Sequence, residues 1–297
     1  MIKRLIFDTA YFVGYRMTSN SLWDEKRSSF KVLRPSFKYW YADPVPFNIN
    51  GDIYVFMEQY DRFSRIGYIA VSKYHNGKLG KPVTIIKKDT HLSFPMIICY
   101  GGEHFMIPET SGSKSIDIYR MGKDVYEWEK YYSYHTEDNV VDVNYLIKDN
   151  EILLIGSCED TNPLNTKRVI YRLTNLLDRT RVDITEIYRD EVASPEVRNA
   201  GALMRCDDKL MRPVQCSIDK VYGHHLALLQ VDSIDDTGIL EKVVDTKYVS
   251  DISIPVNPLL NKKAAIHTCG CIDGVFETID INCIRPSVLP IIRKLLL

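Results

Sequence analysis

Four acidic side chains lie beside apolar, strand-like segments, where burial disfavours a charge that has no partner. Asp43 and Asp142 lie near the starts of such segments, and Glu58 and Glu109 end two others. Carboxyl groups that face one cavity can act as a general acid and a general base. One protonates a leaving oxygen while another activates an incoming oxygen. These residue types therefore point to chemistry at a glycosidic or phosphoester bond.

A repeated hairpin must position these side chains. Two-residue turns recur at Asn50-Gly51, Gly101-Gly102, Asp149-Asn150, Asp207-Asp208 and Asp273-Gly274. Between the second residues of successive turns the spacings are 51, 48, 58 and 66 residues, which is typical of four-stranded blades with their loops. The sequence therefore predicts an all-β fold, a five-bladed β-propeller.

Residues of different blades can be compared by their distance from the turn, because each innermost strand should begin near one axial funnel. Eight residues before the second turn residue lie Asp43, Phe94, Asp142, Ala200 and Ile266. Seven residues after it lie Glu58, Glu109, Ser157, Gln215 and Ile281. Further polar side chains near these positions are His91, Ser93, Arg198, Asn199, Arg212, Tyr222, His267 and Thr268. We expect a polar funnel; in the alternative interpretation Asp43 caps a turn and the glutamates form ion pairs with nearby arginines.

The chain is expected to form a single domain over residues 1–297, with its ends completing the ring. After Asp273-Gly274 only two clear strands precede Pro286, so the fifth blade is short. Tyr11–Arg16 and Ser29–Leu33 are expected to pair with this blade and close the ring, which removes free sheet edges. Residues 286–297 are a candidate for a short apolar helix, which packs on the propeller or contacts a membrane surface.

Composition limits the function classes. Lys and Arg number 38 against 39 Asp and Glu, and this balance argues against nucleic acid as a partner. No apolar run is long enough to span a bilayer, and the first residues do not form a signal peptide. Seven cysteines, several within apolar segments, indicate reduced thiols and a cytoplasmic protein, at most peripheral to the inner face of a membrane. Cys269-x-Cys271 has no accompanying CxxC or HxxxH, so we expect neither a metal nor a cofactor.

Several short motifs occur in an order that is informative. They are Trp40-Tyr41-Ala42-Asp43-Pro44, Phe56-Met57-Glu58, Leu92-Ser93-Phe94-Pro95, Ile107-Pro108-Glu109-Thr110-Ser111, Arg212-Pro213-Val214-Gln215, Tyr222-Gly223 and His267-Thr268. From about Tyr11 to Asp280 the chain resembles the N-terminal propeller of glucosamine inositolphosphorylceramide transferase-like proteins. That family is similar in fold to the arabinanase, levansucrase and invertase superfamily of five-bladed propellers. The resemblance implies that Asp43 is in the place of the general base of family 43-like glycosidases, and Asp142 in that of the carboxylate that tunes their acid.

The chain departs from the hydrolases of this superfamily at the general acid. Those hydrolases have their general-acid glutamate in the region between blades 3 and 4. In this chain Glu191 and Glu196, before Arg198, are the candidates there, and neither fits a motif. The leading hypothesis is therefore a glycosyltransferase of cell-surface polysaccharide or glycolipid synthesis, and the alternatives are a glycoside hydrolase and a noncatalytic sugar-binding or scaffolding propeller.

Each candidate residue has an expected role under this hypothesis. The catalytic candidates are Asp43, Glu109 and Asp142. The substrate-binding candidates are Glu58, His91, Ser93, Arg198, Asn199, Arg212, Gln215, Tyr222 and His267, with Arg198 and Arg212 expected to hold a donor phosphate or a substrate carboxylate. The expected partners are a sugar or glycolipid acceptor and a nucleotide-sugar donor.

Overall fold

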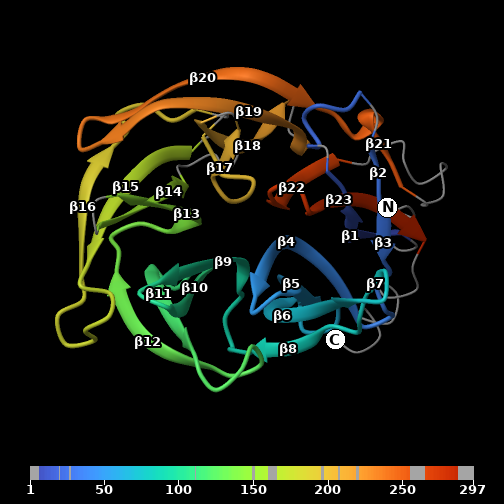
Figure 1. The fold of residues 1–297 in the computed structure, drawn as a ribbon, viewed down its shortest axis with the longest axis horizontal. Coiled ribbons are helices and arrows are strands. Elements are labelled where there is room, and N and C mark those ends of the chain that lie inside the picture. Colours follow the sequence, from blue (N-terminus) through green and yellow to red (C-terminus); the bar gives the residue numbers. More distant parts are fainter. Residues whose placement is uncertain are drawn as a thin grey trace.

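The computed structural model describes residues 7–286 except 20, 27, 111, 149–150, 160–165, 195–196, 207, 219–220 and 255–264. Five of its sheets are arranged as blades around a central axis, in chain order from blue through green and orange to red (Figure 1). The predicted five-bladed β-propeller is confirmed.

Blades 1 to 3 each follow the chain from the centre outwards. Blade 1 contains β4 (Tyr39–Ile49), β5 (Asp52–Asp61), β6 (Ile66–His75) and β8 (Val83–Ile86), with the short β7 (Lys78–Leu79) beside β6. Blade 2 contains β9 (Ser93–Tyr100), β10 (Glu103–Glu109), β11 (Ser115–Met121) and β12 (Trp128–His135). Blade 3 contains β13 (Val140–Lys148), β14 (Glu151–Glu159), β15 (Thr166–Thr174) and β16 (Asp183–Arg189).

The last two blades differ from this pattern. Blade 4 contains β17 (Met204–Cys206), β18 (Lys209–Ile218), β19 (Val221–Asp235) and β20 (Gly238–Lys247). Blade 5 contains β22 (Ala265–Ile272), β23 (Phe276–Pro286), β1 (Phe7–Met17) and β3 (Lys31–Leu33). A small parallel pair joins β2 (Ser28–Ser29) to β21 (Ile252–Ser253), which follows the single turn of 3-10 helix η1 (Val249–Asp251).

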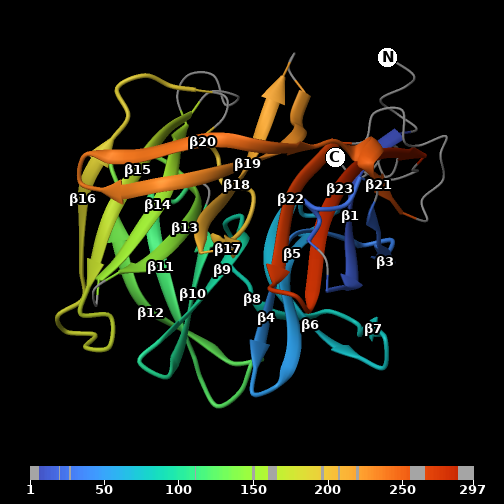
Figure 2. The same cartoon turned by 45° about the horizontal axis from the view of Figure 1, so that its top comes forward.

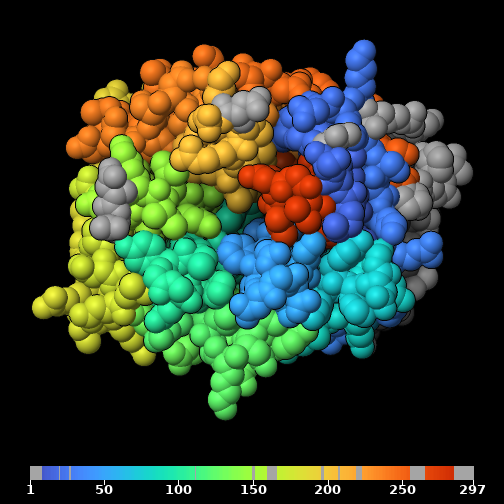
Figure 3. Space-filling view, in the orientation of Figure 1, coloured from blue at the N-terminus to red at the C-terminus, as the bar shows by residue number. Residues whose placement is uncertain are grey.

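The N-terminal strand closes the ring, as the sequence predicted. β1 pairs with β23 along its whole length, from Phe7 opposite Pro286 to Met17 opposite Phe276. The blue N-terminal segment therefore lies against the red strands of blade 5 in the ribbon and in the space-filling view (Figures 1 and 3). The predicted strand over residues 29–33 is divided, because the Phe30 N–H donates to Ser253 O at 2.9 Å while Lys31–Leu33 pair with β1.

Tight turns join the two inner strands of blades 1 and 2. In the first, Asn50 and Gly51 both have positive φ, 54° and 87°, and Gly101 and Gly102 repeat this with 60° and 81°. Such values define the hairpin turn that matches strand twist, and they favour Gly and Asn. Asp149-Asn150 and Asp207 lie outside the described residues. The described turns lie at one end of the ring, which we call the turn end, and the inner strands begin at the opposite end, which we call the site end (Figure 2).

Apolar side chains pack mainly between neighbouring blades. One cluster joins blades 2 and 3 through Ile98, Phe105, Leu154 and Tyr171, all with at most 2% of their surface exposed. Similar clusters join blades 1 and 2 and blades 4 and 5. Burial of this area supplies the main stabilisation of the ring. No described helix is long and apolar enough to cross a membrane, and the predicted helix of the tail falls beyond Pro286, outside the described residues.

Candidate active site

The inner strands of four blades start with the same irregularity. Register shifts occur after Ala42, after Ser93, after Val141 and after Ile266, so at each shift two residues of the inner strand lie opposite one residue of its partner. Asp43, Phe94 and Asp142 are the first residues of three of these bulges, and their φ values are 49°, 43° and 49°. The predicted equivalence of these three positions is confirmed.

The prediction is wrong by one residue in blade 5, where His267 and not Ile266 begins the bulge. The last pair before the turn is Ile272 with Phe276, so this turn has three residues and the inner strand is one residue shorter.

In blade 4 the predicted strand from Ala200 begins only at Met204. Ala200 O instead accepts the Cys269 N–H of blade 5 at 2.7 Å, and a side chain at Gly201 would meet Cys269 O.

Backbone N–H groups of the bulges bind carboxylates of the preceding blade. Asp43 N–H donates to Asp280 Oδ2 at 2.9 Å, Phe94 N–H to Asp43 Oδ2 at 3.2 Å, and Asp142 N–H to Glu109 Oε2 at 3.1 Å. These three bonds cross the seams between blades 5 and 1, 1 and 2, and 2 and 3. The site carboxylates therefore also satisfy buried backbone donors. For Asp43 this is a structural role of the kind that the alternative interpretation gave it.

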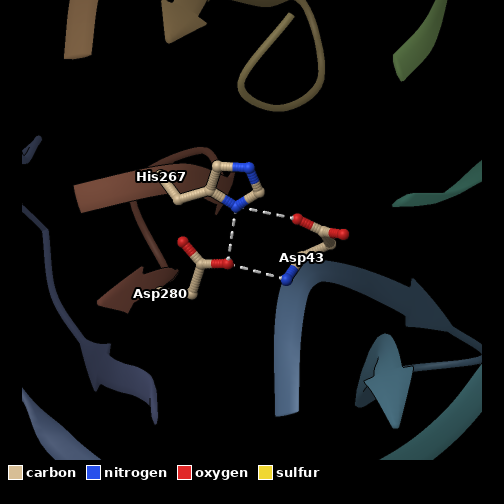
Figure 4. Close-up of side chains that lie close together, drawn as sticks. All are labelled: Asp43, His267 and Asp280. Atoms are coloured by element: carbon tan, nitrogen blue, oxygen red, sulfur yellow. Dashed lines mark hydrogen bonds and ion pairs between the residues drawn. The ribbon is translucent and has the colours of Figure 1, made fainter. Parts of the chain in front are cut away.

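Asp43, His267 and Asp280 form one compact group (Figure 4). His267 Nδ1 lies 3.2 Å from Asp43 Oδ1 and 3.2 Å from Asp280 Oδ2. Asp280 is fully buried, and its Oδ1 also accepts the Thr268 N–H at 2.7 Å. One ligand atom from each of the three residues lies within 4.8 Å of the others, so this group could hold a metal ion, a possibility that the sequence motifs did not suggest.

The sequence reasoning missed Asp280. It lies opposite the blade 5 bulge, one residue before Ile281, which was the position compared with Glu58. A carboxylate inside the apolar segment from Ile279 to Ile281 was the available signal.

Glu58 and His91 form a second contact in blade 1. Their Oε1 and Nε2 atoms are 3.3 Å apart, and Gly67 N–H donates to His91 Nδ1 at 3.0 Å, so a neutral His91 ring carries its proton on Nε2. Burial lowers the pKa of His91. Burial and then the charge of Asp43 raise the pKa of Glu58 well above its ordinary value. A Cβ atom on Gly67 would lie 2.6 Å from Glu58 Oε1, so only glycine admits this arrangement.

Glu109, Asp142 and Arg198 form the third group. Arg198 Nε donates to Asp142 Oδ2 at 2.6 Å, and its Nη2 lies 4.0 Å from Glu109 Oε2. Burial and then the charge of Asp142 raise the pKa of Glu109 to about 8, although Arg198 opposes this shift. Glu109 is paired across the sheet with Ser93, which is also buried. A carboxyl group with this pKa is largely protonated at neutral pH and can donate a proton.

Two amides complete the support of Asp142. Gln215 Nε2 donates to Asp142 Oδ2 at 3.0 Å, and Asn199 Nδ2 donates to the Asp142 carbonyl at 2.7 Å. The structure thus brings together Asp43, Glu58, His91, Ser93, Glu109, Asp142, Arg198, Asn199, Gln215 and His267 at the site end. Tyr222 belongs to β19, but its side chain lies outside the described part of the structure.

Arg212 does not face a ligand, contrary to its predicted contact with phosphate. Its side chain has no exposed surface, and it binds Glu241 by two hydrogen bonds of 2.8 and 2.6 Å. It also donates to Asn199 Oδ1 at 2.9 Å, so it supports the site from behind. Glu241 belongs to the outer strand β20. Counting residues from the turn between the inner strands could therefore not identify it.

The fold and the buried carboxylates define a five-bladed propeller with a polar site where its inner strands begin, and the comparisons give its family. Residues 31–252 match the family described as glucosamine inositolphosphorylceramide transferase 1, N-terminal. The chain belongs to this family. A search of curated proteins finds no match.

Solved structures share the fold at low identity. A thermostable family-43 glycoside hydrolase is 11% identical over 70% of this chain and 75% of that protein, with a TM-score of 0.52. The GH62 α-L-arabinofuranosidase of Coprinopsis cinerea is 8% identical over 82% of this chain and 90% of its own catalytic domain, with a TM-score of 0.53. The exo-β-1,3-galactanase of Phanerochaete chrysosporium is 9% identical over 90% of this chain and 64% of that protein, with a TM-score of 0.54.

Proposed function

We propose that the chain is a glycosyltransferase of polysaccharide or glycolipid synthesis that acts at the central carboxylates. The proposal rests mainly on Glu109, a buried carboxyl with a pKa of about 8. The charges of Asp142 and Asp43 both contribute to this raised pKa. The family name, which refers to a transferase for a glucosamine-containing glycolipid, supports the reaction type.

In this mechanism Asp43 is the general base and Glu109 the general acid. Asp43 takes the proton of the acceptor hydroxyl, whose oxygen bonds to the anomeric carbon of the donor sugar. The bond from that carbon to the leaving oxygen breaks, and Glu109 supplies a proton to that oxygen. His267 and the Phe94 N–H hold Asp43 in place, while Asp142 keeps the pKa of Glu109 high. Glu109 is assigned as the acid because burial and the charge of Asp142 raise its pKa.

The charge of the site favours a sugar over a phosphate at its centre. Asp43, Glu58, Glu109, Asp142 and Asp280 are all at most 8% exposed, and Arg198 is the arginine that contacts this group. A protonated amino sugar would match this excess of carboxylates, in keeping with the glucosamine of the family name. A donor phosphate would lie beside Arg198, whose guanidinium is 4.0 Å from the Glu109 carboxyl that protonates the leaving oxygen.

The same acid and base would serve hydrolysis if water replaced the acceptor. This second candidate rests on the separate acid and base roles, which a glycoside hydrolase also requires. One observation argues against hydrolysis. The resemblance to hydrolases implies a general acid shortly before Arg198, but the side chain from this segment that contacts Asp142 beside Arg198 is the amide of Asn199, and no described carboxyl of the segment does so.

A thermal-shift screen combined with a turnover assay tests the proposal. Nucleotide sugars, free nucleotides and simple glycosides are each mixed with wild type, with Asp43→Asn and with a control variant. The control is Glu103→Gln, which changes a partly exposed glutamate that is paired with Arg120. Stabilisation by a nucleotide sugar and transfer lost only in Asp43→Asn are expected. Release of free sugar would favour the hydrolase, binding without turnover a sugar-binding module, and no response to any of these ligands would refute the proposal.

A further inference from the structure

An exposed aromatic pair stands at the site end of blade 1. Phe37 precedes β4 and is 58% exposed, and Phe63 lies in the loop between β5 and β6 and is 39% exposed. Their ring centroids are 5.7 Å apart with an interplanar angle of 61°. Two phenylalanines in contact with each other and with solvent are unusual unless the surface has a partner.

The backbone under the two rings is firmly held. Asp61 Oδ1 accepts the Phe63 N–H at 2.9 Å, which fixes the loop. Arg62 is only 2% exposed, donates through NH1 to Phe37 O at 2.8 Å and through its N–H to Lys38 O at 2.9 Å. Buried polar groups therefore present the rings outward, and the exposure does not result from a loose loop.

Exposed cations lie close to the aromatic pair along the chain and at the end of the neighbouring strand β8. Arg34, Lys38, Arg65 and Lys87 are exposed, and Lys87 lies 5.0 Å from the ring centre of Tyr68. Lys38 pairs with Asp61 at 3.3 Å, whereas Arg34 and Arg65 form no ion pair within the described ranges. The exposed Asp89 follows Lys87 by two residues. The surface thus has a net positive charge around an apolar tip.

We propose that Arg34, Phe37, Lys38, Phe63, Arg65 and Lys87, here called the blade 1 patch, bind the surface of a bilayer with anionic headgroups. Apolar rings that enter the interface and cations that bind headgroups are the two components of such contacts. The rings meet edge to face and present no single flat surface, which disfavours stacking on a polysaccharide.

The patch is tied to the carboxylate site through two strands. β4 and β5 carry Asp43 and Glu58 and continue to the patch; from Asp43 to Tyr39 is four strand residues, or about 13 Å. A propeller bound to the bilayer through this patch would direct its site end to the membrane and to substrates carried by lipids. This orientation rests on the proposed function, but the bilayer contact itself does not.

Vesicle co-sedimentation tests the patch. Wild type is mixed with phosphatidylcholine vesicles or with vesicles containing about one third phosphatidylglycerol, at low and high salt. We expect binding to the anionic vesicles, weakened by salt, and a loss of at least tenfold in affinity for Phe37→Ser/Phe63→Ser. The arginine variant Arg34→Gln/Arg65→Gln should lose the preference for phosphatidylglycerol.

A matched control removes two exposed apolar side chains from loops at the turn end. Tyr126→Ser/Leu177→Ser changes residues that are 42% and 49% exposed and should bind vesicles as wild type does. Circular dichroism of each variant establishes that it is folded. The proposal is overturned if folded wild type stays in the supernatant, if the Phe37/Phe63 variant binds equally well, or if only an insoluble polysaccharide retains the wild type. Sugar binding in the thermal-shift screen would be unchanged by these results, so the two proposals fail separately.

Discussion

Replacing Glu109 by glutamine should alter how stability depends on pH. The pKa of this carboxyl is about 8 in the folded protein against an ordinary value of 4.5. Between these values the folded chain holds one proton more than the unfolded chain, so folding stability falls as pH rises through this window. At about 1.4 kcal/mol per pH unit, the wild type loses up to about 5 kcal/mol, and Glu109→Gln removes this loss.

Urea unfolding from pH 5 to pH 9, followed by tryptophan fluorescence, measures the effect. The variant should resemble wild type near pH 5 and be more stable by about 3 to 5 kcal/mol at pH 9, because its neutral amide replaces a buried charge. Glu103→Gln, on the same strand with a side chain that is 36% exposed, should follow the wild-type curve. If the Glu109→Gln and wild-type curves run parallel over the whole range, Glu109 is ionised throughout, and its role as an acid must be abandoned.

Three further substitutions test the supports of the site, each by urea unfolding at pH 7. Arg212→Met should cost about 2 to 4 kcal/mol because it removes two hydrogen bonds to Glu241, which keeps its ion pair with Arg168, and the hydrogen bond to Asn199 Oδ1, whereas Arg120→Met, 41% exposed, should cost less than about 1 kcal/mol. Gly67→Ala should cost about 1 to 3 kcal/mol because its methyl group would lie 2.5 Å from a carbonyl oxygen; Gly80→Ala, with its nearest atom at 3.4 Å, should be tolerated. Asp280→Ala should cost about 2 to 5 kcal/mol because it leaves two buried backbone N–H groups without an acceptor. Equal losses for a substitution and its control, or a neutral Asp280→Ala, would contradict these assignments.

The fold was predictable because its turns carry a strong local signal. Asn50-Gly51 and Gly101-Gly102 require positive φ, and the strands beside them pair at once, so turn spacing identifies the blades. Counting from the turns then located Asp43, Phe94 and Asp142, since the strands between turn and bulge have equal length in blades 1 to 3.

The rest of the site depends on contacts that no spacing records. Asp280 acts across the seam between the last blade and the first, and Glu241 reaches Arg212 from the outer strand of its own blade. Residue type alone made Arg212 resemble a ligand-binding arginine, because the sequence does not show which carboxylate of the folded chain its guanidinium binds. The single-residue shift at His267 arises because the inner strand of blade 5 is one residue shorter between bulge and turn, which a count based on strands of equal length cannot detect.

Closure of the ring by β1 makes the assembly of the site a late event in folding. Phe7 pairs with Pro286, so the contacts of this seam join nearly opposite ends of the chain, and such contacts form slowly because a long loop must close first. During synthesis, four blades can hydrogen-bond their own strands before β23 exists, yet Asp43 then has neither His267 nor Asp280 beside it. A nascent or truncated chain would therefore have folded blades without a complete site. Ligand binding would then indicate that β1 has paired with β23 and the ring is closed.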